Sequence, residues 1–294
     1  LGGIIMLKKT ISIILIMLLL VSNMSSLAIA DAEMGRNVVV SLGKNLTNEQ
    51  RSSMLNYFGV SNDVDIVEVT NAEEREYLGK YIDDKLLGTR SLSCAYVEKL
   101  DEGSGISVDT HNISWVTKDM YENALITAGI KDAKVVVASP INVSGTAALT
   151  GIIKAFEDIT GEDISKKEKE VASEEIAKTA MLGNEIGKDE ASELIENVKV
   201  DVVANNKKSK KDIKEAVESA ADELQIQLTE EQINEIVDLM RKISKLDLNL
   251  DDIKTQLKDI SGKIDKIVNQ NEEVKSFLQR IVDYIGEFFS KLFG

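Results

Sequence analysis

The chain has 294 residues, of which 50 are acidic and 35 basic, so its formal net charge at pH 7 is −15. A surface of this sign repels nucleic-acid phosphates and anionic lipid, and we expect no nucleic-acid partner. A single cysteine excludes an internal disulfide, and a single histidine leaves no cluster of zinc ligands. We therefore expect neither a metal site nor another cofactor.

The first 30 residues have the pattern of a secretory signal peptide. Lys8 and Lys9 precede an apolar run at 11–21, and the small residues of a cleavage site end at Ala30. The apolar run is shorter than the roughly 20 residues of a membrane span. We expect cleavage after Ala30, with the residues before Met6 as an upstream extension, and hence a secreted, extracellular protein. A retained amino-terminal anchor is the alternative.

Residues 31–161 have the pattern of an α/β domain, with a mixed sheet of about five strands and packed helices. The run Val135–Val137 is typical of a strand that is buried on both faces, and Pro140 should end its ladder because it has no N–H to donate. Thr47 opens a helix through a capping box. Strands are expected at 37–42, 64–69, 91–99 and 106–115, and from Ala133 up to Pro140. Helices are expected at 47–58, 71–81 and 117–128, and from a start at 144–146 to a stop at Gly161.

Two helices in this domain begin and end alike at a constant offset, since Thr47 corresponds to Thr117 and Gly59 to Gly129. A duplicated βαβ unit is one interpretation of this correspondence. The alternative is that two capped helices share the usual α/β pattern by chance.

A turn-rich tract at 101–105 joins two of the predicted strands and indicates a β-hairpin. In the hairpin register Cys94 lies directly opposite His111, on the face that also carries Asp109. A thiol beside an imidazole can form a thiolate nucleophile, and a carboxylate can orient the ring, so these three are candidate catalytic residues. The alternative is a half-buried cysteine beside a hydrogen-bonded histidine, and a one-residue slip in register would separate the two.

The loop at 139–146 lies between a strand and a helix start, where an α/β sheet usually holds its ligand. Free N–H groups and the positive helix end could hold phosphate, sulfate or carboxylate. No glycine-rich nucleotide fingerprint is present, and the alternative is that the glycine and alanines let helix and sheet pack closely. The candidate ligand-binding residues are Asn142, Ser144, Gly145 and Thr146.

After residue 161 every segment has helical periodicity, with a helical region at 162–246 and a tail at 247–294. Ser165 and Thr229 open further capping boxes. Apolar residues then recur in steps of three and four, as in a heptad seam. The candidate assembly residues of the tail are Ile253, Leu257, Ile260, Ile264, Asn271, Leu278 and Ile285.

This coiled-coil pattern predicts self-association or a partner protein bound through the carboxy-terminal helices. A helical hairpin packed on the first domain would give the same pattern. Four of the six phenylalanines fall in the tail, which favours burial in an assembly; an amphipathic helix on a membrane surface is the alternative.

Three blocks carry a resemblance to known proteins: GKNLTNEQRSSMLNYFGV, SCAYVEKLDEGSGISVDTHNISWVTKDMYENALITAGI and VVVASPINVSGTAALTGIIKAFEDITG. Together they resemble the YpuA-like family of secreted Firmicutes proteins, a domain of unknown function, over about 31–260. The resemblance implies export and a Gram-positive cell-envelope setting. The family brings no established activity, so no catalytic residue is carried over.

We therefore expect a secreted, envelope-associated protein that binds or assembles and is not an enzyme, with a cell-wall component as a candidate partner. The alternative is a hydrolase or transferase acting on envelope polymers, through Cys94 and His111 or through the loop at 142–146.

Overall fold

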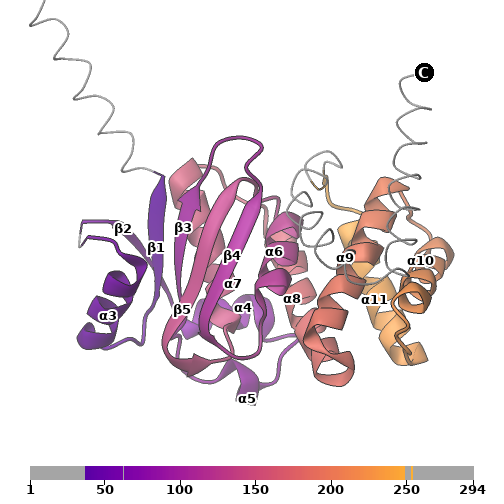
Figure 1. The fold of residues 1–294 in the computed structure, drawn as a ribbon, viewed down its shortest axis with the longest axis horizontal. Helices are drawn as coiled ribbons and strands as arrows, with labels where there is room; N and C mark the ends of the chain where they lie inside the picture. Colours follow the sequence, from indigo (N-terminus) through magenta and orange to yellow (C-terminus); the bar gives the residue numbers. More distant parts are fainter. Residues whose placement is uncertain (1–36, 62, 249–252, 254–294) are drawn as a thin grey trace, which may run out of the picture.

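The computed structural model describes residues 37–61, 63–248 and 253. In these residues a mixed five-stranded sheet with packed helices is followed by a region made only of helices, as the sequence predicts (Figure 1). The predicted signal peptide lies outside the described residues. The strands are β1 (Val38–Gly43), β2 (Asp65–Val69), β3 (Cys94–Lys99), β4 (Ile106–Ile113) and β5 (Ala133–Val143).

Six of the nine described helices begin at a residue whose side chain caps the helix. The capping boxes predicted at Thr47, Ser165 and Thr229 are all formed, each with the Glu or Gln three residues later. The helices are α3 (Asn48–Phe58), α4 (Asn71–Leu78), α5 (Asp84–Leu87), α6 (Lys118–Thr127), α7 (Thr146–Thr160), α8 (Lys166–Ile186), α9 (Lys188–Ala204), α10 (Lys210–Glu223) and α11 (Glu230–Ile243).

The predicted hairpin is wrong, because β5 lies between β3 and β4 in the sheet order β2-β1-β3-β5-β4. The reason is burial. In β5 the run Val135–Ala138 has side chains that are buried or half-buried on both faces, whereas β4 is exposed over Asp109–Asn112. The more apolar strand takes the centre of the sheet and the more polar strand takes the edge.

Pro140 does not end β5, which continues to Val143. The pairing of β4 with β5 shifts in register between His111 and Ile113, and Asn112 there has a φ of 57°. The side chain of Asn112 donates to the Ser139 carbonyl at 2.9 Å. The proline therefore lies beside an irregularity in the ladder, where a missing N–H is tolerated.

Two βαβ units are present, but they are not copies of one another. β1–α3–β2 and β4–α6–β5 both join parallel neighbours, and both step in the same direction along the sheet. However, α3 packs on the face that carries Val40 and Cys94, and α6 packs on the opposite face, with Val39 and Ala95. The two crossovers therefore have opposite hand and cannot be superposed, which favours a shared α/β pattern over duplication.

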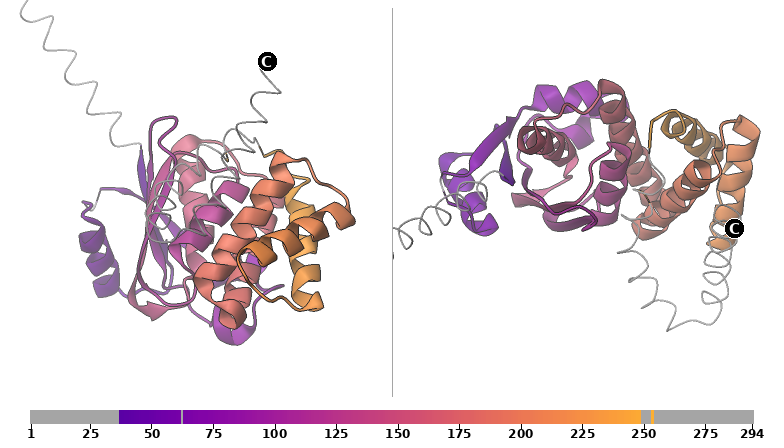
Figure 2. Two further views of the ribbon diagram at one scale, coloured as in Figure 1. Left: turned by 45° about the vertical axis from the view of Figure 1, so that its right-hand side comes forward. Right: turned by 90° about the horizontal axis from the view of Figure 1, so that it is seen from above.

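The sheet separates two layers of unequal depth. Among the described helices, α3 lies by itself on one face, and α4, α6, α7 and α8 lie on the other (Figure 2). α7 approaches the sheet closely, because a Cβ on Gly151 would lie 2.0 Å from the Ser41 hydroxyl oxygen of β1. Small residues thus permit this close packing of helix on sheet.

Helices α9, α10 and α11 pack on one another and against α8. The apolar seam of α11, with Ile236, Leu239 and Ile243, is buried against α8, α9 and α10 within the helical region. Ile253 is buried in the main core at 2 % exposure, so it is not available to an oligomeric seam. The other candidate assembly residues, from Leu257 onward, lie outside the described residues. Of the helices described, none is long and apolar enough to cross a membrane.

Candidate functional site

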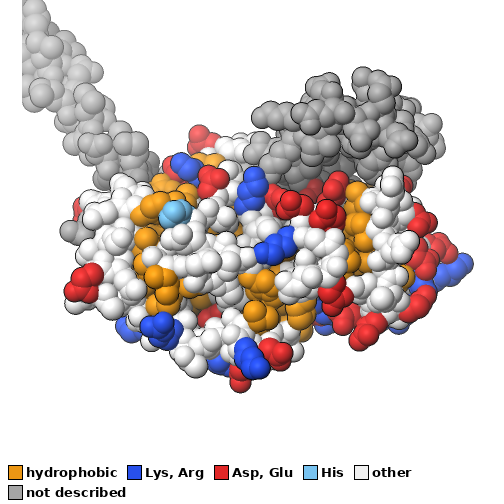
Figure 3. All heavy atoms as spheres, turned by 60° about the horizontal axis from the view of Figure 1, so that its bottom comes forward, with side chains coloured by type: hydrophobic (Ala, Val, Ile, Leu, Met, Phe, Trp, Pro, Cys, Tyr) orange, Lys and Arg blue, Asp and Glu red, His pale blue; other side chains and the backbone are white. Residues whose placement is uncertain are grey.

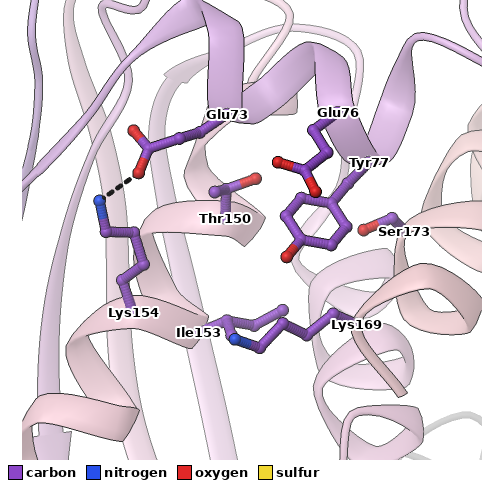
Figure 4. A pocket seen from close by; sticks show the side chains of 8 residues that line it. All are labelled: Glu73, Glu76, Tyr77, Thr150, Ile153, Lys154, Lys169 and Ser173. Atoms are coloured by element: carbon purple, nitrogen blue, oxygen red, sulfur yellow. Dashed lines mark hydrogen bonds and ion pairs between the residues drawn. The ribbon is translucent and has the colours of Figure 1, made fainter. Parts of the chain in front are cut away.

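A cavity of about 200 Å³ opens where α4, α7 and α8 meet on the covered side of the sheet (Figure 4). We call it the α4/α7/α8 pocket. The consecutive helices α7 and α8 and the distant helix α4 supply its lining. The lining residues are Glu73, Glu76, Tyr77, Thr150, Ile153, Lys154, Lys169 and Ser173.

Helical spacing explains why these side chains face one cavity. Residues four apart lie on the same face of a helix, and each helix contributes such a pair. α4 supplies Glu73 and Tyr77, and α7 supplies Thr150 and Lys154. The remaining pair comes from α8, with Lys169 and Ser173. The pocket is thus formed where one face of each of the three helices meets the other two.

The charged groups of the pocket are held in ion pairs. The Lys154 ammonium lies 2.6 Å from the Glu73 carboxylate and also donates to the Glu68 carbonyl at 2.6 Å. Burial alone would raise the pKa of Glu73, but hydrogen bonds from Lys154 and from Thr70 outweigh it and lower the pKa. Glu73 is therefore ionised and fixed, which makes it a poor general acid or base.

The other two charges of the lining also have partners. Lys169 lies 2.7 Å from a Glu157 carboxylate oxygen, and Glu76 lies 3.8 Å from the Lys166 ammonium. Each charged side chain of the pocket thus has a neighbour of opposite sign.

Two hydroxyl groups of the pocket, by contrast, are free. Within the described part of the chain, Thr150 and Ser173 have no hydrogen-bond partner. Other helical hydroxyls donate to the carbonyl four residues earlier, as in Thr160 to Phe156 at 2.8 Å and Thr179 at the same distance. Both free residues are largely buried, with exposures of 7 % and 3 %. Their hydroxyls are therefore available to a molecule in the cavity.

The start of α7 lies one turn before the pocket and holds the predicted ligand loop. There the Thr146 hydroxyl donates to the buried carboxylate of Glu74, and burial raises the pKa of that carboxyl. The Ser144 hydroxyl lies 3.3 Å from the Leu86 carbonyl oxygen. Gly145 has a φ of 98° and accepts a hydrogen bond from the buried Tyr121 hydroxyl at 2.6 Å. The chain itself thus supplies a carboxylate where an anion was predicted to bind.

Asn142, the remaining candidate ligand-binding residue of the loop, is exposed near the end of β5.

The structure does not bring Cys94 and His111 together. Both pair with Ala138 of β5, which places them on one face but with a strand between them. Cys94 is fully buried and its thiol lies 3.6 Å from the Leu92 carbonyl oxygen. Burial raises the pKa of the thiol to about 12, so the reactive thiolate is not populated at neutral pH.

His111 lies on the surface beside hydrophobic side chains (Figure 3). Its ring stacks on that of Tyr57, with centroids 4.7 Å apart. Asp109 shares its face and is also exposed. The catalytic interpretation of these residues was wrong about their geometry, because the predicted pairing of β3 with β4 does not occur.

The described residues contain no group of three or more His, Cys, Asp or Glu side chains placed to hold a metal ion.

Comparison with known proteins gives a family. The family model described as "Protein of unknown function (DUF1002)" matches residues 42–260. The chain belongs to the DUF1002 family. This DUF1002 chain is 41 % identical over 270 residues to "Uncharacterized protein YpuA" of Bacillus subtilis (strain 168), which covers 92 % of this chain and 91 % of that protein. The predicted resemblance is thereby confirmed, and no solved structure matches.

None of the residues that line the pocket of this DUF1002 chain was singled out from the sequence. One signal was present: α7 is largely apolar, but Thr146, Thr150 and Lys154 recur at steps of four along it. A polar stripe on an apolar helix indicates a face that meets polar groups inside the fold. The partners on α4 and α8 are ordinary charged helix positions, which give no such signal.

Proposed function

We propose that this protein is an exported, cell-envelope-associated binding protein, that it is not an enzyme, and that the α4/α7/α8 pocket is its binding site. One observation carries the proposal: Glu73, Lys154 and Lys169 are held in close ion pairs, while the hydroxyls of Thr150 and Ser173 are free. Such a site offers hydrogen bonds to a ligand but no activated nucleophile, acid or base.

The envelope setting is supported by two features of the sequence. The first 30 residues have the charge, apolar run and small-residue end of a signal peptide. The resemblance to the YpuA-like family implies export and a Gram-positive cell-envelope setting. A cell-wall component is the partner that an exported binding protein would meet there. The acidic surface disfavours nucleic acid as an alternative partner.

The catalytic alternative needs a reactive group that the geometry does not favour. Cys94 is buried with a raised pKa, and β5 separates it from His111. Glu73 is the most buried carboxylate of the pocket lining, and Lys154 holds its pKa below the ordinary value. A general acid working near neutral pH would need the opposite shift.

The test uses the mature chain, residues 31–294, and purified Gram-positive cell walls. We expect the protein to sediment with the walls and to release no soluble wall fragments. Cys94→Ala should leave both results unchanged and serves as the matched control. Fragment release that disappears in Cys94→Ala would establish the enzymatic alternative, and a protein that stays in the supernatant would refute binding.

A further inference from the structure

We infer that the α4/α7/α8 pocket binds a neutral, hydroxyl-rich group of the size of one sugar residue, such as a single unit of a wall glycan. This inference rests on the proposed function and names the ligand class of the same site. Charge, hydrogen bonding and size each contribute an argument.

The charges of the pocket favour a neutral ligand. Its lining carries two glutamates and two lysines, and each has a partner of opposite sign within 4 Å. A charged ligand would compete with the close pairs, for example by separating Lys154 from Glu73, whose atoms are 2.6 Å apart. A neutral ligand can instead use the remaining acceptor positions of the carboxylates without breaking a pair.

The hydrogen-bonding groups favour a ligand with several hydroxyls. Thr150 and Ser173 each offer one donor and two acceptor positions, and the Tyr77 hydroxyl offers another donor in the same cavity. Figure 4 shows Glu76, Tyr77 and Thr150 around a common space, with Ser173 on the α8 side. A site of mixed donors and acceptors matches sugar hydroxyls, which also donate and accept. An analogue without those hydroxyls would leave polar groups of the site unpaired.

The size of the cavity favours one ring. A volume of about 200 Å³ is smaller than the pockets of about 300–1,000 Å³ that hold drug-sized ligands. Ile153, which is 4 % exposed, and the ring of Tyr77 add apolar surface on which the C–H face of a sugar ring can pack.

The experiment measures binding of N-acetylglucosamine to the mature chain by ligand-observed NMR titration. Glucosamine and glucuronate are the charged comparisons, because they keep the ring but add an ammonium or a carboxylate. We expect the neutral sugar to bind best. Thr150→Val and Ser173→Ala should each weaken its binding about five- to tenfold, since each removes one hydrogen bond to the ligand.

Thr160→Val is the matched control, because it makes the same substitution on the same helix at a hydroxyl that is bonded within the chain. It should leave the affinity for the sugar unchanged. Thermal unfolding of each variant shows that it is folded, and Ser173→Ala keeps the inference testable if Thr150→Val does not fold.

The outcomes separate this inference from the proposed function. Tighter binding of a charged sugar, or wall binding that neither pocket variant weakens, would overturn the ligand class while leaving an envelope-binding protein. No binding of any sugar together with no binding of walls would overturn both.

Discussion

Replacing Lys199 with methionine should destabilise the folded protein by about 3–5 kcal/mol, because it leaves a buried carboxylate without its counter-charge. Lys199 and Glu175 are 2 % and 0 % exposed, and their charged atoms lie 2.5 Å apart between α9 and α8. The Lys199 ammonium also donates to the Asn123 carbonyl of α6 at 2.7 Å. In the variant, the Thr127 hydroxyl at 2.5 Å would be the only group left bonded to that carboxylate.

The contact between Lys199 and Glu175 is chiefly an ion pair. Glu175 Oε1 lies within 2.5 Å of the ammonium but receives no well-aligned hydrogen bond. Burial raises the pKa of Glu175, and Lys199 opposes that rise. Without Lys199 the carboxyl should take up a proton more readily, so the loss of stability in Lys199→Met should shrink as the pH falls.

Urea unfolding of the mature chain, followed by circular dichroism, measures this loss of stability. Lys211→Met is the matched control, since Lys211 and Glu215 form an exposed pair with side-chain exposures of 84 % and 60 %. It should cost less than about 1 kcal/mol. The double variant Glu175→Gln with Lys199→Met should recover most of the loss. A cost for Lys199→Met no larger than that of the control would refute the reasoning.

Three further predictions concern single residues. Burial raises the pKa of Glu196 to about 8, whereas the unfolded carboxyl titrates near its ordinary value of 4.5. Between pH 4.5 and about 8 the Glu196 carboxyl is therefore protonated in the folded state but ionised in the unfolded state. The free energy of unfolding falls as the pH rises through this range, and Glu196→Gln should flatten the pH dependence of the unfolding midpoint. Gly151→Ala would place a methyl group 2.0 Å from the Ser41 hydroxyl oxygen and should cost about 1–3 kcal/mol in urea unfolding; unchanged stability would contradict the close packing. Cys94 should resist thiol labelling in the folded protein, and His111→Ala should not alter its rate; rapid labelling that depends on the histidine would contradict the assigned burial.

Much of the fold could be predicted from the sequence because its signals are local. The side chains of Thr47 and Ser165 cap the backbone N–H three residues later and so mark the start of a helix. Gly59 and Gly161 end helices in the left-handed conformation. Such signals depend only on residues that are close in the chain, so they can be recognised before the fold is known. The partner of a strand, by contrast, is not set by residues close to it in the chain.

The order of the strands could not be predicted in the same way, because pairing depends on competition between strands. The short loop between β3 and β4 suggested a hairpin, yet the apolar β5 is buried better at the centre. Cys94 and His111 lie at the same level along the strands, as they would in a hairpin, but Ala138 of β5 lies between them. The predicted alignment of Cys94 with His111 was therefore correct, but the predicted direct pairing of β3 with β4 was not. The catalytic interpretation depended on that direct pairing, so the fold does not support it.

The pocket could not be predicted from the sequence for a related reason. Its hydroxyls come from α7 and α8, and their freedom depends on which side chains happen to lie nearby in space. In the sequence Thr150 and Ser173 look like any helical Thr and Ser. Only the folded chain distinguishes them from Thr160, which bonds to its own helix.

The most direct test of the central claim is a map of backbone amide chemical shifts when soluble wall-glycan fragments are added to the isotope-labelled mature chain. We predict that the changes gather on α4, α7 and α8 around Tyr77, Thr150 and Ser173. Changes confined to the loop at 142–146 or to the surface around His111, with none at the pocket, would contradict it.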